Sequence, residues 1–260
     1  GGIAEEDVLE DISGGCAATV AYLDGSDWGA TNTGVSVDAN GVLSGSKFMV
    51  PDAAQATWIA VVGSDAAGDA AVALVAGSDV AAQAQASHAL IDLTKRASTL
   101  DFAGVKAQRV LSGDKVDSAI RDYLLIGALL TAAEAVGSTS ACLAGIVDYL
   151  KTRKQFGKLI GSFQALKHPT VDIYVGMEHS RSLVYHASSE IDDGPLSTEA
   201  EVACRMAKAK ASDTIQYAGD RSVQFHGGFG FTWECDSSLF IRRAAWSQQQ
   251  FGDAMHQRRR

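Results

Sequence analysis

The sequence predicts an α+β fold, with an antiparallel β sandwich or barrel in residues 1–113 and a four-helix bundle in residues 114–260. Short β-favouring runs separated by turn residues fill the first part. The second part holds long segments of helix-forming residues with short connections between them. The chain has 260 residues, of which 47% are apolar, so it can bury a substantial core and is not expected to be disordered.

The β part is predicted from four apolar runs and the turn signals that separate them. Turn residues at Asp24-Gly25, Asn40-Gly41 and Gly68-Asp69 interrupt the runs. Asn-Gly directly before an apolar residue is typical of a β-hairpin, so we expect one at Asn40-Gly41. The expected strands cover residues 17–23, 34–37, 58–62 and 71–75.

The helical part is predicted to contain four long helices. Residues 116–152 have no proline and are apolar on most faces, as a helix buried in a bundle is. A second helix is expected over 162–191, with Ser162 as its N-cap and Pro169 in its early turns. Thr198 and Glu201 form a capping box at the start of a third, which runs to residue 224. A fourth covers residues 237–256.

Composition excludes several classes of partner. The net charge of −9 argues against nucleic acid or an anionic membrane surface. No apolar run is expected to span a membrane, and the first residues do not resemble a signal peptide. The four cysteines have no CxxC pair and no ligand spacing, so we expect free thiols in a cytoplasmic protein and no metal site. They are Cys16, Cys142, Cys204 and Cys235.

The first motif that can bind a ligand is Arg153-Lys154-Gln155-Phe156-Gly157, where the first long helix is expected to end. A guanidinium at this place can meet a phosphate with paired donors. Gln155 adds an amide, Phe156 a stacking face and Gly157 freedom to turn. The alternative is an arginine that only offsets the macrodipole at a helix C-terminus.

A second motif follows the third predicted helix and reads Gln224-Phe225-His226-Gly227-Gly228. A glycine pair lets the backbone approach a ligand closely. The alternative is a glycine-rich helix stop with a hydrophobic plug. We expect His226, and likewise His168, to be hydrogen-bonded structural histidines. Neither has an acid or a nucleophile at a sequence spacing that would indicate a catalytic pair.

Together with Gly161-Ser162-Phe163-Gln164, these motifs resemble in order and spacing the C-terminal domain of the acyl-CoA dehydrogenase family. Residues 43–48, Leu-Ser-Gly-Ser-Lys-Phe, resemble a strand of the family's middle β domain, and Asp101-Phe102-Ala103-Gly104-Val105 resembles the closing strand of that domain. The resemblance covers nearly the whole chain. The family's N-terminal helical domain would precede Gly1, outside this sequence.

The resemblance implies a flavoenzyme that binds FAD between the middle domain and the helices, with the far end of the dinucleotide completed by a neighbouring subunit. It assigns this contribution in trans to the two motifs. It also implies an acyl-CoA substrate and, as in most of the family, an electron-transfer flavoprotein as electron acceptor, with oxygen as the alternative. The residues assigned to FAD are Arg153, Gln155, Phe156, Gln164, Gln224, Gly227 and Gly228.

The chain departs from the family where one subunit binds its own flavin. The usual Thr-Glu-Pro segment with its Gly-Ser-Asp run reads Thr-Val-Ala-Tyr-Leu-Asp-Gly in residues 19–25. The usual Trp-Ile-Thr reads Met49-Val50-Pro51. Pro51 can supply neither a hydroxyl nor a backbone N–H to a flavin ring.

The catalytic base of the family is also missing. The reaction removes a proton α to a thioester and needs a carboxylate there. One family position, in a Glu-Gly-Thr turn, reads Phe251-Gly252-Asp253, and the other falls at Gly127. The acids that could substitute are Asp122, Glu134, Glu234 and Asp253; each is more simply a surface or structural acid, and Asp253 is the least implausible base.

Three hypotheses follow. The first is a supporting subunit of a heteromeric, α2β2 acyl-CoA dehydrogenase that gives the trans half of the FAD site to a homologous catalytic partner. The resemblance extends to actinobacterial assemblies that act on CoA thioesters of steroid side chains, so a sterol-derived acyl-CoA is the expected substrate. The second is a catalytic homo-oligomer with an unusual base. The third is a non-enzymatic scaffold of the same fold.

Overall fold

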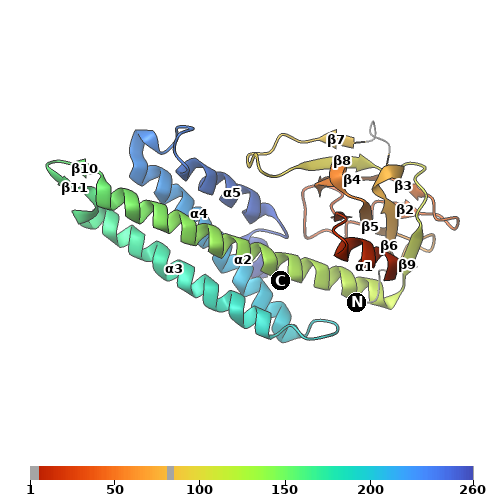
Figure 1. Cartoon of the computed structure of the whole chain (residues 1–260). Helices are drawn as coiled ribbons and strands as arrows, with labels where there is room; N and C mark the ends of the chain where they lie inside the picture. The colour runs from red at the N-terminus through yellow and green to blue at the C-terminus, as the bar shows by residue number, and fades with distance from the viewer. Residues whose placement is uncertain (1–5, 81–84, 260) are drawn as a thin grey trace. The chain divides into compact units, whose positions relative to one another are not determined.

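The computed structural model describes residues 6–80 and 85–259. Contacts between Cα atoms divide the chain into two compact units, residues 1–122 and 123–260. This division falls within helix α2 (Asp114–Thr152), which begins at the residue where the sequence places the domain boundary. The boundary itself stays a prediction. In Figure 1 the first unit holds most of the strands together with α1, and the second holds the long helices together with β10 and β11.

The first unit contains two β-sheets and a short N-terminal helix, α1 (Glu6–Ser13). One sheet has the order β3-β2-β5-β6-β9, with β1 also paired to β5, and the other has the order β4-β8-β7. The strands of the larger sheet are β1 (Ala18–Ala21), β2 (Ser36–Val37), β3 (Leu43–Ser44), β5 (Trp58–Ser64), β6 (Ala70–Ala76) and β9 (Arg109–Ser112). Those of the smaller sheet are β4 (Ser46–Pro51), β7 (Gln85–Ser87) and β8 (Ala97–Asp101).

Strand pairing is mostly antiparallel, and the α+β class is confirmed. β5 and β6 form the longest ladder, from Trp58 opposite Ala76 to Ser64 opposite Ala70. The expected hairpin at Asn40-Gly41 is present, because β2 and β3 pair there in antiparallel register. Two pairs depart from the expected antiparallel arrangement: β1 and β2 both run parallel to β5. Such pairing needs a long connection between the paired strands, which residues 22–57 supply for β1 and β5.

The core of this unit is formed by both sheets. Burial alternates along β6, as a strand with one face on a core requires. Side chains from the two sheets belong to one buried cluster, whose members include Val37, Val50, Ile59, Val75 and Leu100.

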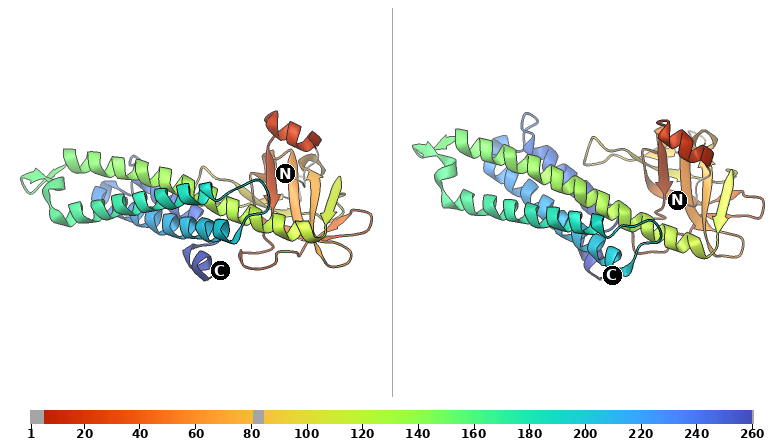
Figure 2. Two further views of the ribbon diagram at one scale, coloured as in Figure 1. Left: turned by 90° about the horizontal axis from the view of Figure 1, so that it is seen from below. Right: turned by 60° about the horizontal axis from the view of Figure 1, so that its bottom comes forward.

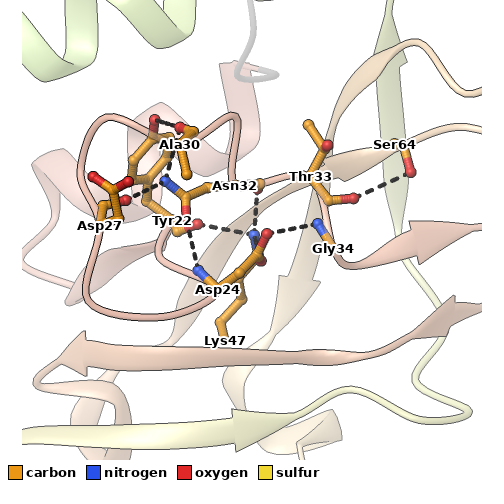
Figure 3. Close-up of polar contacts among 9 residues, drawn as sticks. All are labelled: Tyr22, Asp24, Asp27, Ala30, Asn32, Thr33, Gly34, Lys47 and Ser64. Carbon is orange, nitrogen blue, oxygen red and sulfur yellow. Dashed lines mark hydrogen bonds and ion pairs between the residues drawn. The ribbon is translucent and has the colours of Figure 1, made fainter.

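A fully buried lysine fixes the long loop after β1. The ammonium of Lys47 donates to the carbonyls of Tyr22, at 2.8 Å, and Asn32, at 2.6 Å, and it forms an ion pair with Asp24 at 2.6 Å (Figure 3). Burial lowers the pKa of Lys47, and the charge of Asp24 opposes that shift. These three partners satisfy the buried charge, which would otherwise be very unfavourable.

The second unit is a bundle of four helices with a short helix at its end. They are α2, α3 (Gln164–Ser189), α4 (Thr198–His226), α5 (Ser237–Gln249) and α6 (Ala254–Arg259). A two-stranded hairpin, β10 (Lys154–Gln155) and β11 (Lys158–Leu159), joins α2 to α3. Figure 2 shows α3 running alongside α4 in both views. Two buried clusters, each with residues from α2 and α4, hold the helices together.

The N-terminal caps of two helices and the continuity of a third predicted helix differ from the sequence prediction. Ser197, not Thr198, is the N-cap of α4, and its hydroxyl accepts from the N–H of Ala200. Ser162 does not cap α3, since its hydroxyl donates to the carbonyl of Leu159 and α3 starts two residues later. The predicted helix over 237–256 is broken into α5 and α6.

The break between α5 and α6 is a tight turn at Phe251 and Gly252. Both residues have positive φ angles, 55° and 87°, which a helix cannot accommodate. The carbonyl of Phe251 accepts from the amide of Gln257 at 2.5 Å, and Gln257 in turn accepts from Arg205. The turn places the ring of Phe251 against Gly127 of α2, where a Cβ atom would lie only 2.2 Å from the ring.

A second fully buried lysine supports this turn. Lys208 of α4 donates to the hydroxyl of Ser212 and to the carbonyls of Ser247 and Gln248 in the last turn of α5. These carbonyls are among those that a helix end leaves without intrahelical partners. Burial lowers the pKa of Lys208 to about 8, and the nearby charge of Asp253 opposes the shift.

Helix α2 is long and apolar enough to cross a membrane by length and composition, contrary to the expectation from the sequence. Half of its most apolar window is buried in the protein, and Leu125, Leu129, Cys142 and Ile146 belong to the bundle core. A core helix of a bundle meets the same criterion.

The contact of Phe251 with Gly127 predicts opposite effects for two glycine substitutions in α2. Gly127→Ala should destabilise the chain by about 1–3 kcal/mol, because the new methyl group forces the ring to move. Gly137→Ala is the matched control: no atom lies within 4 Å of its Cβ position, so better helix propensity should stabilise the chain by about 0.5–1 kcal/mol. Urea unfolding measures both. When Phe251 is also alanine, Gly127→Ala should instead stabilise the chain as Gly137→Ala does, and an equal cost in both backgrounds would contradict this packing.

Candidate functional site

One cavity of about 660 Å³ lies in the helical unit where α2 and α4 both end. Its volume is within the range of about 300–1,000 Å³ that is usual for small-molecule sites. Both sequence motifs contribute to it, although about seventy residues separate them. The lining residues are Tyr149, Arg153, Gln155, Phe156, Ile160, Phe163, Leu166, Phe225, His226, Gly227, Gly228 and Phe229.

The β10–β11 hairpin presents Phe156 at its tip. Gln155 pairs with Lys158, so Phe156 and Gly157 are the two central residues of the hairpin. Their φ angles of 52° and 79° are those of a type I′ turn, which prefers Asn-Gly. Phe156 is 89% exposed, and its ring packs edge-on against that of Phe163, with ring centroids 6.1 Å apart. An aromatic residue here exposes apolar area and strains the backbone, which the fold of this chain alone does not explain.

Arg153 lies one residue after the end of α2, and its side chain is exposed. Its backbone N–H donates to Tyr149 and its carbonyl accepts from Ile160, so the backbone is held at this position. Among the described residues the guanidinium has no hydrogen bond or ion pair. An unpaired guanidinium on a cavity wall, carried by a backbone held in place, is a suitable donor for an anionic group such as a phosphate.

The glycine pair begins where α4 ends. Gly227 has φ 60° and ψ −141°, a conformation essentially restricted to glycine. A Cβ atom on Gly228 would meet nothing within 4 Å, so its backbone is open to a ligand. Gly230, two residues later, packs against the carbonyl of Val223, where a Cβ atom would lie at 2.4 Å. Gly227 and Gly228 therefore both leave space at the cavity, and Gly227 also needs its positive φ angle, whereas Gly230 is required by packing.

The end of α4 is held against α2 by an aromatic stack. The rings of Tyr149 and His226 lie 4.2 Å apart with 29° between their planes. His226 Nδ1 is 2.7 Å from the carbonyl oxygen of Ser222, one helical turn earlier. Phe225 is buried in the same core as Ile146 and Leu150 of α2. The stack and this core bring the two motifs to one cavity.

Five of the seven residues assigned to a ligand from the sequence line this cavity, namely Arg153, Gln155, Phe156, Gly227 and Gly228. Gln164 and Gln224 are exposed and do not line it. Sequence reasoning did not name Tyr149, although it lies four residues before Arg153 and so shares its helix face. His226 was assigned only a structural hydrogen bond, and it also forms part of the wall.

These features fit the ADP part of a dinucleotide. An unpaired guanidinium suits a diphosphate, the exposed ring of Phe156 suits a planar base, and Gly228 permits close approach of backbone N–H groups. The remaining wall is apolar, with Phe163 and Leu166 from the start of α3.

In the β unit, the segment that the resemblance assigns to flavin in cis is occupied by its own contacts. The two carboxylate oxygens of Asp24 bind Lys47 and the N–H of Gly34. The hydroxyl of Thr19 donates to the carbonyl of Pro51 at 2.7 Å. These groups are therefore committed within the chain.

The two positions at which the resemblance places a catalytic base hold Gly127 and Phe251, and the two residues touch. The ring of Phe251 also packs edge-on against Tyr123, with ring centroids 5.6 Å apart. An aromatic ring therefore fills the space over Gly127, and neither residue can accept a proton.

The acids considered as substitutes have structural contacts or lie at the surface. Asp253 accepts from the N–H of His256 at 2.7 Å, as a cap of α6 does. Glu134 forms an ion pair with Arg243, Asp122 pairs with Arg121, and Glu234 is exposed. In the described part of the chain, no group of three or more His, Cys, Asp or Glu side chains could hold a metal ion.

Known proteins resemble the chain in sequence and in fold. The family model "Acyl-CoA dehydrogenase, C-terminal domain" matches residues 118–259. The chain is 40% identical over 133 residues to "Acyl-CoA dehydrogenase IpdE2" of Mycolicibacterium smegmatis, a match that covers 51% of this chain and 40% of that protein. The chain thus spans about two fifths of the length of that relative.

Two solved structures extend the likeness to the β unit. The ChsE4-ChsE5 complex from Mycobacterium tuberculosis matches with a TM-score of 0.80 and 25% identity, covering 96% of this chain and 66% of that one. The Tcur3481-Tcur3483 steroid ACAD matches with a TM-score of 0.82 and 25% identity, covering 97% of this chain and 68% of that one. Because the family model matches more than half of its length, the chain belongs to the acyl-CoA dehydrogenase family.

Proposed function

We propose that this chain is a subunit of an FAD-dependent acyl-CoA dehydrogenase, which desaturates an acyl-CoA thioester between its α and β carbons. In this assembly the chain supplies the half of the FAD site that binds the ADP part in trans. A homologous partner subunit supplies the flavin-ring side and the base.

The observation that carries this proposal is the contrast between the two parts of the chain. The cavity at the ends of α2 and α4 is open, with the guanidinium of Arg153 unpaired among the described residues and Phe156 exposed. The segment of residues 19–25 is instead occupied by contacts with Lys47, Gly34 and Pro51. A subunit that binds cofactor only for its neighbour needs the first site and not the second.

The absence of a base at both family positions favours a non-catalytic, supporting role for this subunit. Phe251 fills the space over Gly127, and the turn that holds it is fixed by Gln257 and Lys208. An acid that abstracts a proton needs access to substrate, and the carboxylate of Asp253 caps α6. A homo-oligomer with Asp253 as its base is therefore the weaker alternative.

A scaffold without flavin is the other alternative. It gives no reason for an exposed phenylalanine at a positive φ angle beside an unpaired arginine. Both features have a use if a nucleotide binds there.

The substrate and partners are proposed from the relatives. One similar structure is described as a steroid ACAD, and another is a complex of two named chains. We propose by analogy a sterol-derived acyl-CoA, an α2β2 assembly, an electron-transfer flavoprotein as acceptor and a cytoplasmic location.

The test of the proposed function is the flavin stoichiometry. The chain is purified alone, and also with a candidate partner that has glutamate where this chain has Phe251. Absorbance spectra and native mass should give no bound flavin for the chain alone and fewer flavins than chains in the assembly. Arg153→Ala should lower the flavin content of the assembly, with Lys151→Ala as the control at an exposed position near the same helix end. One flavin per chain in a homo-oligomer would contradict the proposal.

Phe156→Asn should separate stability from cofactor binding. Asn-Gly is the preferred type I′ sequence, so the variant should be more stable by about 0.5–1 kcal/mol. It also removes the exposed ring, so FAD should dissociate from the assembly faster by roughly tenfold, about 1–1.5 kcal/mol. Thermal unfolding and flavin fluorescence on release give the two quantities. A variant that gains stability and retains FAD as well as the original chain would show that Phe156 has no role in binding.

A further inference from the structure

His226 has one ring nitrogen that the fold leaves free at the cavity. Its Nδ1 lies 2.7 Å from the carbonyl oxygen of Ser222. A carbonyl oxygen can only accept, so Nδ1 carries the hydrogen of this bond. The stack on Tyr149 covers one ring face. Nε2, on the opposite edge of the ring, is left for another partner.

Nε2 is also accessible. In the described part of the chain, Nε2 has no hydrogen-bond partner. Every buried side-chain nitrogen or oxygen in that part has a partner, so an atom without a partner is not buried. Nε2 is therefore reached by solvent rather than enclosed. Because His226 is half-buried and lines the cavity with Arg153 and Gly228, this atom is available to a ligand bound there.

We propose that His226 is a ligand-contacting residue, whose protonated Nε2–H donates to a phosphate oxygen of the nucleotide bound in this cavity. The proposal rests on the proposed function, because it names a further contact of the same half-site. It differs from the expectation that His226 has only a structural hydrogen bond. The hydrogen bond from Nδ1 to Ser222 orients the ring, and Nε2 donates to the phosphate.

The surroundings of the ring suit this role. Tyr149 from α2 stacks on the ring, and Arg153, just after the end of that helix, lines the same cavity. The α3 side of the cavity is formed by Phe163 and Leu166, and the ammonium of Lys158 lies 4.7 Å from the centre of the Phe163 ring. No acid lines the cavity, so no carboxylate among the lining residues competes with a phosphate for Nε2–H.

The proposal gives nucleotide binding a defined pH dependence. Histidine side chains in general change charge between about pH 5 and pH 8, whereas arginine side chains do not. A diphosphate that is esterified at both ends keeps its charge over this range. Binding should therefore tighten as the pH falls, and the change belongs to His226.

The experiment is a calorimetric titration of the full chain with ADP-ribose, which has an ADP part with a doubly esterified diphosphate. Titrations at about pH 6 and about pH 8 compare the original chain with His226→Gln and Arg153→Ala. Glutamine keeps an N–H for the carbonyl of Ser222 but does not titrate. The original chain should bind about five- to tenfold more tightly at the lower pH. His226→Gln should lose this difference while its affinity at pH 8 stays within about twofold. Arg153→Ala should be weaker at both pH values and keep the difference.

A pH difference that persists in His226→Gln, or that is missing from the original chain, overturns the role of His226. If Arg153→Ala still weakens binding in that case, the proposed function stands without it. If the original chain does not bind ADP-ribose at either pH, the role of His226 is overturned, whereas the proposed function, which expects flavin only in the assembly, is decided by the flavin stoichiometry. Thermal unfolding midpoints at both pH values confirm that each variant is folded during its titration.

Discussion

The contact between the end of α2 and the end of α4 is the constraint on which the candidate site depends. Tyr149 stacks on His226, and Phe225 is buried with Ile146 and Leu150 directly beneath. Without this junction, Arg153 and the glycine pair would belong to two separate helix ends. Helix packing is therefore what converts two distant sequence motifs into one cavity, and the bundle core stabilises the cavity wall as well as the fold.

The chain uses buried lysines to fix backbone where regular hydrogen bonding stops. Lys47 holds the loop after β1, and Lys208 holds the last turn of α5. In each case the ammonium binds carbonyl oxygens that would otherwise be buried without a partner. The consequences differ. The first lysine closes the segment that could have met a flavin ring, and the second supports the turn that places Phe251 over Gly127. The cavity around Arg153 has no such closure, which is why we assign the remaining function to it.

Sequence motifs identified residues that the structure brings to one cavity, whereas several details of the fold were missed. Arg153, Gln155, Phe156, Gly227 and Gly228 were found from local motifs, because each motif lies within a few residues at a helix end. The parallel pairing of β1 with β5 could not be predicted, since it depends on a long connection and not on local alternation. The break at Phe251 was missed because phenylalanine rarely adopts a positive φ angle, and only Gly252 signalled a turn. Tyr149 carries no motif, and only its helical spacing from Arg153 could have indicated it.

The most direct test of the central claim is an experimental structure of this chain assembled with its catalytic partner and FAD. The account predicts that the ADP part lies against Arg153 and Gly228 of this chain, while the flavin ring lies on the partner subunit. It also predicts the ring of Phe251 over Gly127 in the assembled protein. A structure in which one copy of this chain holds the whole FAD, or in which partner side chains fill the cavity and no nucleotide is bound, would contradict it.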